Sequence, residues 1–294
     1  MIASHPTPFP AYGHRDTGRR GSSHNISNSA VQLPRKLSRP EYEEVSKRAI
    51  IAASPEMARG DIPPPEYIQQ GLLAQTSQLM SGLSSLAPSH LPSSLPSSHL
   101  PAFLTIPLRP PTSSTTPHYP THALAVSSSN NPEAQALIIP IHALVVASHC
   151  ARFPEIRAPS SRLQGHNLQL PVIPITLPSP GAFTVLVNYM YSHRLDKVLK
   201  ELLSPMPSGF MSNLSRRDIR DILDSRSTLH ELSKYLCEHD QYSLQQLTAR
   251  TVRVRDVWYD LVALGLHAPE LWDALDLAWE VILGALNIAA APRA

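Results

Sequence analysis

The sequence has little cysteine and no long apolar run, and both shortages limit the classes of protein to which it can belong. Cys150 and Cys237 are the two cysteines among 294 residues, too few for a disulfide framework. No stretch approaches the roughly 18 uncharged apolar residues that a membrane-spanning helix needs. The first residues, MIASHPTPFPAYGHR, also lack the apolar segment of a secretory signal peptide. We therefore expect a protein of a reducing, intracellular compartment that has no membrane contact.

The sequence also lacks a strong charge imbalance and the common signatures of catalysis. Its formal net charge is +2, from 25 basic and 23 acidic side chains, which argues against direct nucleic-acid binding. The patterns G-x-S-x-G, H-E-x-x-H, Walker A and G-x-G-x-x-G are all absent. We therefore expect no catalytic residues, no metal site and no cofactor, and we predict that the protein is not an enzyme.

Proline is abundant in this sequence, and it is unevenly distributed. Residues 1–120 hold 18 of the 30 prolines and include the serine-rich stretch APSHLPSSLPSSHLP at 87–101. Proline removes a backbone donor and restricts the residue before it, so this density opposes both helices and sheet ladders. We predict that residues 1–120 form a largely disordered arm with short helices near 40–53 and 65–86.

The first of these short helices carries a capping signal. Ser38 stands where an N-cap would, and Glu41 three residues later completes a capping box. Glu43 and Lys47 are then spaced for an ion pair on one helix face. The pattern predicts a helix that starts at Ser38.

The second short helix has apolar residues at near-heptad spacing. Two interpretations remain open: the helix packs onto the rest of the chain, or its apolar face binds a partner protein. The candidate partner contacts on this helix are Ile68, Leu72, Leu79 and Leu83.

From residue 121 the pattern changes to that of a folded domain. Two short strands, THALAVSS and AQALIIPIH, flank the turn formers of SSNNPE, and VIPITL at 172–177 reads as a further strand. Ser179 as N-cap and Pro180 at the first helical position then mark an amphipathic helix, and helical patterns follow to the end of the chain. The sequence predicts an α+β fold, in which a small sheet of short strands precedes a mainly helical part, within one domain of residues 121–290.

The last helical pattern opens at Pro269 and carries two tryptophans. Trp279 lies on its apolar face, as a core residue would, whereas Trp272 lies at the edge of that face and Asp273 lies off it. Trp272 is therefore a candidate contact for a partner protein. Packing within the chain is the alternative, and we favour it.

Ser148, His149 and Cys150 stand side by side in an apolar run that reads as helix. Neighbours on a helix point about 100° apart, so these three side chains cannot converge on one substrate atom. The alternatives are a reactive or zinc-binding site completed by Cys237 and His239, and a buried stretch of helix. We favour the buried helix, with the three residues in its middle and with Ser148 bonded to a main-chain carbonyl or to a neighbour.

Two serines follow paired basic residues with one residue between, the pattern that basophilic kinases favour. These candidate phosphorylation sites are Ser22 in GRRGSS and Ser38 in PRKLS. A phosphate would add nearly two negative charges, and at Ser38 it would stabilise the start of the predicted helix. The alternative is a solvated basic tail without such a role.

The order of elements from residue 121 resembles a BTB/POZ domain. In that family a strand leads to a histidine at the start of a helix that ends in an aromatic residue, and a second strand leads to an aromatic-rich helix. The residues in those places are His142, Phe153, Phe183, Leu186, Tyr189 and Tyr191. The resemblance implies a protein-interaction domain, with a homodimer as one form.

A second likeness covers more of the chain. The segments RPEYEEVSKRAIIAASPEM, IPPPEYIQQGLLAQTSQLM and LPVIPITLPSPGAFTVLVNYMYSHRLDKVLKELL are similar to basidiomycete clampless-type proteins, regulators of sexual development and clamp-cell formation. This resemblance implies a non-enzymatic developmental regulator that acts through protein contacts in the nucleus, the cytoplasm or both. Its partners would be transcriptional or cell-cycle regulators. The alternatives are a BTB-type substrate adaptor for a ubiquitin ligase and, less favoured, a cysteine-dependent enzyme.

Overall fold

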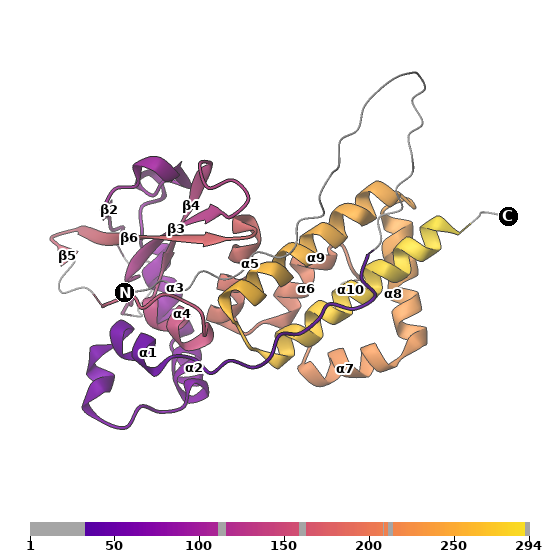
Figure 1. The fold of residues 1–294 in the computed structure, drawn as a ribbon, viewed down its shortest axis with the longest axis horizontal. Coiled ribbons are helices and arrows are strands. Elements are labelled where there is room, and N and C mark those ends of the chain that lie inside the picture. The colour runs from indigo at the N-terminus through magenta and orange to yellow at the C-terminus, as the bar shows by residue number, and fades with distance from the viewer. Residues whose placement is uncertain (1–32, 111–115, 159–162, 208, 211–213, 292–294) are drawn as a thin grey trace, which may run out of the picture. The chain divides into compact units, whose positions relative to one another are not determined.

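The computed structural model describes residues 33–110, 116–158, 163–207, 209–210 and 214–291. The chain divides into two units, Met1–Arg35 and Lys36–Ala294, and every helix and strand of the described residues lies in the second. That unit combines a curled mixed sheet with α-helices, which confirms the predicted α+β class (Figure 1).

The sheet has the spatial strand order β1-β4-β3-β6-β2, and β5 pairs with β6. The strands are β1 (Ser94–Pro96), β2 (Phe103–Pro107), β3 (His122–Ser128), β4 (Gln135–Ile141), β5 (Leu163–Gln164) and β6 (Asn167–Leu177). β3 and β4 form the antiparallel hairpin that the turn formers predict, whereas β3 and β6 run parallel. The first half of β6 pairs with β2 and the second half with β3, so one long strand links the two parts of the sheet.

Residues 33–110 form helices and strands, although the proline content predicts disorder there. β1 and β2 lie at the two edges of the main strand order, where proline is tolerated because one side of an edge strand makes no ladder hydrogen bonds. Pro96 and Pro107 each stand last in such a strand. Leucines of the same segment pack on a buried cluster that includes Ile106 and Leu170, and they are Leu91, Leu95, Leu100, Leu104 and Leu108. This apolar burial stabilises the segment, so folded structure begins well before residue 121.

The α-helices of the described residues occupy both ends of this unit. They are α1 (Lys47–Ala53), α2 (Pro65–Ala74), α3 (Thr76–Ser84), α4 (Ala143–His149), α5 (Pro180–Ser192), α6 (Leu195–Leu203), α7 (Arg216–Asp224), α8 (Arg226–His239), α9 (Leu244–Leu264) and α10 (Pro269–Ala290). Short 3₁₀ helices are η1 (Pro55–Arg59), η2 (Pro88–His90) and η3 (Ser97–His99). Ser179 is the N-cap of α5 and α10 begins at Pro269, as predicted. Among the described residues, no helix combines the length and the apolar character that crossing a membrane requires.

The first helix begins at Lys47, so the prediction of a start at Ser38 is wrong. Its N-cap is Ser46, whose hydroxyl accepts a hydrogen bond from the backbone three residues on, at 3.3 Å. The residues between Ser38 and Ser46 are not helical, because their side chains bind distant parts of the chain. Glu43, for example, was expected to pair along a helix with Lys47, but it accepts from Nε of Arg152 at 2.7 Å.

The helix predicted at 65–86 is divided into α2 and α3. Ile68 and Leu79 are buried, with exposed fractions of 5% and 4%, because α2 packs against α4 and α5 and this face of the two helices turns inward. Leu72 and Leu83 are half-buried. The interpretation that holds is packing within the chain, and the assignment of Ile68 and Leu79 to a partner surface is wrong.

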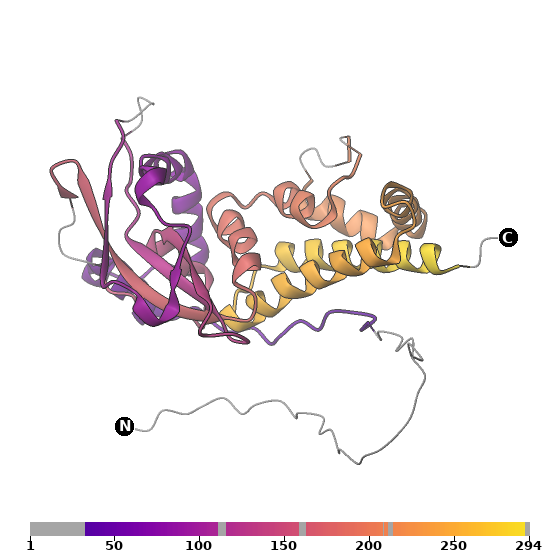
Figure 2. The ribbon, with the colours of Figure 1, turned by 90° about the horizontal axis from the view of Figure 1, so that it is seen from above.

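Helix α10 packs against several other helices. It contacts α6, α7, α8 and α9, and Figure 2 shows it running beside α9. Trp272 and Trp279 are each 1% exposed. The assignment of Trp272 to a partner surface is therefore wrong, because neighbouring helices cover the edge of the apolar face as well as its centre.

Candidate functional site: a charged clasp beside a histidine cavity

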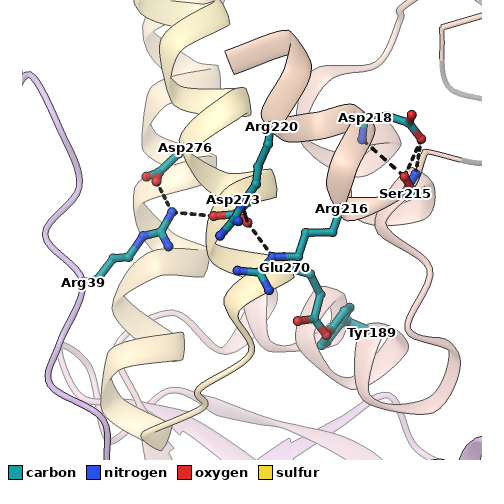
Figure 3. Close-up of polar contacts among 9 residues, drawn as sticks. All are labelled: Arg39, Tyr189, Ser215, Arg216, Asp218, Arg220, Glu270, Asp273 and Asp276. Atoms are coloured by element: carbon teal, nitrogen blue, oxygen red, sulfur yellow. Dashed lines mark hydrogen bonds and ion pairs between the residues drawn. The ribbon is translucent and has the colours of Figure 1, made fainter. Parts of the chain in front are cut away.

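A buried carboxylate on α10 receives three arginines. The side chain of Asp273 is 5% exposed. It accepts from Nε of Arg216 at 2.8 Å and from Nε of Arg220 at 2.9 Å. Nη2 of Arg39 donates to the same carboxylate at 2.9 Å and also binds Asp276 (Figure 3). We call these five residues the clasp.

Helix α7 supplies two of the three arginines. Arg216 and Arg220 are four residues apart, so both side chains leave the same face of the helix. A capping box holds the start of α7: the Ser215 hydroxyl accepts from the Asp218 amide at 3.3 Å, and the Asp218 carboxylate accepts from the Ser215 amide at 2.8 Å. The first residue after this cap is Arg216 (Figure 3), so the cap fixes the position from which it reaches α10.

The arginines keep Asp273 ionised. Burial alone raises the pKa of Asp273, because it disfavours the charged form. The hydrogen bonds from Arg216, Arg39 and Arg220 lower that pKa and outweigh burial, so it lies below its ordinary value. Burial lowers the pKa of Arg39, but its bonds to Asp276 and Asp273 raise it by more. Each partner therefore stabilises the charge of the other.

The third arginine belongs to residues 36–46, an irregular extended segment that we call the strap. Leu37 of the strap is buried. Trp258 on α9 donates its indole N–H to the carbonyl of Ser38 at 3.0 Å. Together with Arg39, these contacts hold the first half of the strap on α9 and α10.

The second half of the strap forms one wall of a cavity of about 290 Å³. Tyr42 meets His267 edge-on, with ring centroids 4.7 Å apart, and Glu43 is paired with Arg152. The other walls come from α2, the end of α4, the end of α5 and the start of α10. The cavity therefore lies where the strap, the N-terminal helices and the C-terminal helices meet.

Two histidines meet in this cavity. Nδ1 of His149 donates to the carbonyl of Val145 at 2.7 Å, so its Nε2 is left to accept from Nε2 of His193 at 3.0 Å. His193 follows α5 with φ of 49°, and its ring stacks on Tyr189 with centroids 5.2 Å apart. Tyr189 in turn donates to Glu270 at 2.5 Å. Two hydrogen bonds and one ring stack therefore link these four side chains into a polar chain from α4 to α10.

This polar chain is built for packing more than for proton transfer. Burial lowers the pKa of His149 to about 4. Burial also lowers the pKa of His193, against an opposing effect of Glu270, so both rings are neutral at pH 7. The pKa of Tyr189 lies above its ordinary value, first because of burial and then because of Glu270. Both nitrogens of His149 already have partners, which leaves it poorly suited to act as a base.

The Ser148-His149-Cys150 stretch is buried, as we favoured, but it lies at the end of α4 and not in its middle, because the helix ends at His149. The hydroxyl of Ser148 donates to the carbonyl of Val145 at 3.1 Å, which is the main-chain bond of the two alternatives that we gave for it. The sulfur of Cys150 lies 3.8 Å from that of Met190, and burial raises the pKa of this thiol. A thiol with a raised pKa is a weak nucleophile, which counts against Cys150 as a reactive cysteine. Within the described ranges, no three His, Cys, Asp or Glu side chains are placed to hold a metal ion.

The candidate phosphorylation sites have different outcomes. Ser38 lies in the strap with an exposed side chain, whereas Ser22 lies outside the described residues.

The clasp was not predicted from the sequence. The spacing of Arg216 and Arg220 was visible, but Asp273 was placed off the apolar face and nothing local linked it to them.

Two family models match the chain. Residues 40–178 match the Clampless protein 1 N-terminal domain, and residues 196–294 match the Clampless protein 1 C-terminal domain. No curated protein and no solved structure matches, so the resemblance to a BTB/POZ domain stays a prediction. Ser38 and Arg39 directly precede the first matched region, and the carboxylates that bind Arg39 lie in the second.

Proposed function

Because the chain belongs to the clampless-type protein family, which indicates a role in fungal development, we propose that it is a non-enzymatic regulator of sexual development. In this proposal it acts in clamp-cell and dikaryon formation through contacts with other proteins, in the nucleus, the cytoplasm or both. The observation that carries the proposal is the pair of family matches, at residues 40–178 and 196–294.

The state of the reactive side chains supports a binding role. Cys150 and Cys237 are both buried and neither is in a disulfide. The paired nitrogens of His149 and the raised pKa of the Cys150 thiol leave little for covalent or acid–base chemistry. His149 and Cys150 instead stabilise the junction between α4 and α5.

Exposed apolar side chains on α2 and α3 are candidate contacts for the proposed partners, which are transcriptional or cell-cycle regulators or a second copy of the chain. Tyr67, Leu73 and Met80 on α2 and α3 are 69%, 39% and 45% exposed. Large apolar groups that stay in water are typical of protein-binding surfaces. They belong to the same two helices in which the sequence suggested partner contacts, but they are different residues.

Affinity purification of the tagged protein from mating hyphae, followed by mass spectrometry, tests the proposal. The strain carries the tagged chain as its sole copy, so clamp formation is scored in the same hyphae. We expect normal clamps and the recovery of transcriptional or cell-cycle regulators. A cullin as the dominant copurifying protein would overturn the proposal in favour of the ubiquitin-ligase adaptor.

Three variants make this experiment sharper: a truncation of the N-terminal residues and two cysteine substitutions. The truncation removes residues 1–35 and no more, because removal of residues 1–120 would delete α1, α2, α3 and the two edge strands. Cys150→Ala and Cys237→Ala, compared at equal protein abundance, test the enzyme alternative. Loss of clamps in a cysteine variant that is still folded would contradict a non-enzymatic role.

A further inference from the structure

The strap presents a serine in the form that a basophilic kinase reads. Arg35 and Lys36 precede Ser38 with one residue between, and paired cations of this kind complement an acidic kinase cleft. The side chain of Ser38 is exposed and the residues around it lack regular secondary structure. The sequence pattern and the local structure therefore agree on the same hydroxyl.

A kinase cannot bind the residues on both sides of Ser38 while the strap is docked. Leu37, directly before it, is buried, and Trp258 binds the carbonyl of Ser38 itself. A kinase that grips both sides of the serine needs these contacts to be broken first. Phosphorylation would therefore select the released form of the strap from a pre-existing equilibrium.

The clasp is built so that the strap can leave it. When Arg39 departs, Asp273 keeps Arg216 and Arg220, so its buried charge remains compensated. Asp276 has a side chain that is 28% exposed, so water can replace its lost partner. Departure of the strap therefore leaves no buried charge without a partner.

A phosphate on Ser38 would shift this equilibrium further. It adds nearly two negative charges beside Arg39 and offers that guanidinium an adjacent partner. The same charges would approach the carboxylates of Asp273 and Asp276 when the strap docks. Both effects favour the released strap over the docked one.

We propose that Ser38 is a phosphorylation site for a basophilic kinase and that the phosphate releases the strap from α9 and α10. In this reaction the γ-phosphoryl group of ATP passes to Oγ of Ser38, forming the Oγ–P bond while the bond to the β-phosphate oxygen breaks. ADP leaves, and the hydroxyl proton passes to the kinase. Release would uncover Trp258 and remove Tyr42 and Glu43 from the wall of the histidine cavity.

The first test measures how docking limits the kinase. The full chain, its Trp258→Phe and Asp276→Asn variants and a free peptide of residues 34–46 are treated with ATP and a basophilic kinase, and phosphate on Ser38 is followed by mass spectrometry. We expect each variant to react about fivefold faster than the wild type, because each loses a contact that contributes roughly that factor to an equilibrium. The peptide should react fastest. A peptide that is phosphorylated while the wild type and both variants are not would overturn the proposal.

The second test measures release itself. The fully phosphorylated chain is compared with the same chain after phosphatase treatment. Ser38→Ala, treated in the same way, is the control for phosphate at other sites such as Ser22. We expect the phosphorylated chain to show stronger acrylamide quenching of tryptophan fluorescence and faster chymotrypsin cleavage after Tyr42. The increase in quenching should be absent in Trp258→Phe. Unchanged or slower quenching and cleavage on a phosphorylated chain would show that the phosphate does not open the strap, and the proposal would be wrong.

Discussion

Two buried aspartates show how neighbouring side chains decide the sign of a pKa shift. Asp260 on α9 is fully buried, like Asp273, but it has no arginine. Its Oδ1 accepts from the amide of Ser179 at 2.8 Å, and its Oδ2 has no hydrogen-bond partner among the described residues. Burial raises the pKa of Asp260 to about 7, the Ser179 amide opposes the shift and Asp256 adds to it. Asp273 shifts the other way because cations surround it.

We predict that the unfolding free energy of Asp260→Asn, relative to that of the wild type, increases as the pH rises. The pKa of Asp260 is higher in the folded protein than in the unfolded chain, so the folded state is penalised increasingly between pH 4 and 7. Asparagine carries no such penalty. Relative to the wild type, the variant should gain about 2 kcal/mol of unfolding free energy between pH 5 and pH 8. Urea unfolding at the two pH values measures this gain.

The control for this prediction is Asp256→Asn, which removes the nearby charge but leaves Asp260 in place. It should retain most of the wild-type pH dependence. Equal stability changes for Asp260→Asn at pH 5 and pH 8 would mean that Asp260 titrates normally.

Among the elements, α7 offers a matched pair of adjacent arginines. Arg216 binds buried Asp273, whereas Arg217 lies 3.9 Å from Asp221 in a pair that is mostly in water. We predict that Arg216→Ala costs about 2 kcal/mol of unfolding free energy at pH 7, because it weakens compensation of a buried charge. Arg217→Ala should cost less than about 0.5 kcal/mol. Urea unfolding of the two variants checks the difference.

The pH dependence of the same pair is a separate check on the clasp. The pKa of Asp273 is lowered in the folded state, so its stabilising effect is present above the unfolded pKa near 4 and is lost as the pH falls through the folded pKa. The excess cost of Arg216→Ala over Arg217→Ala should therefore shrink in strong acid. A constant excess would assign the effect of Arg216 to packing of its aliphatic part.

Two helical glycines test how α3 is packed. A Cβ at Gly82 would lie 1.6 Å from the carbonyl oxygen of His118, whereas a Cβ at Gly71 of α2 would meet nothing within 4 Å. We predict that Gly82→Ala destabilises the protein by about 3 kcal/mol, because backbone must move to admit the methyl group. Gly71→Ala should stabilise it by roughly 0.5 kcal/mol through helix propensity. Thermal unfolding of both variants measures this, and a stable Gly82→Ala would show that α3 does not contact residue 118.

Across the whole molecule, elements with a local signal were predictable and those set by distant contacts were not. Ser179 with Pro180 marked α5, and the turn formers marked the hairpin of β3 and β4. β1 and β2 carry no such signal, because they exist through burial of leucines against β4 and β6. The clasp joins Arg39 to a residue 234 positions away. Helical periodicity placed Asp273 off the apolar face, because it cannot report that α7 and the strap cover that side.

For the molecule as a whole, the question is whether the two regions matched by the family models are separate domains. The family models end at 178 and resume at 196, but α5 fills the gap and contacts β3 and β4 as well as α9. Asp260 of the second region binds the amide of Ser179 at the start of α5, and Cys150 of the first region forms a backbone β-bridge with Leu266 of the second. Arg39, directly before the first region, reaches Asp273 of the second. These contacts bind residues 36–294 into one compact unit. Parts joined in this way should lose their structure together.

We therefore predict that a chain starting at Lys36 unfolds in one calorimetric transition, with equal calorimetric and van't Hoff enthalpies. Fragments 36–194 and 195–294, expressed alone, should fail to fold, because each exposes the apolar surface that α5 and α9 bury between them. Their coexpression should restore the transition, since the missing surface is then supplied in trans. Two resolved transitions in the intact chain, or an independently folded C-terminal fragment, would show that the matched regions are true domains.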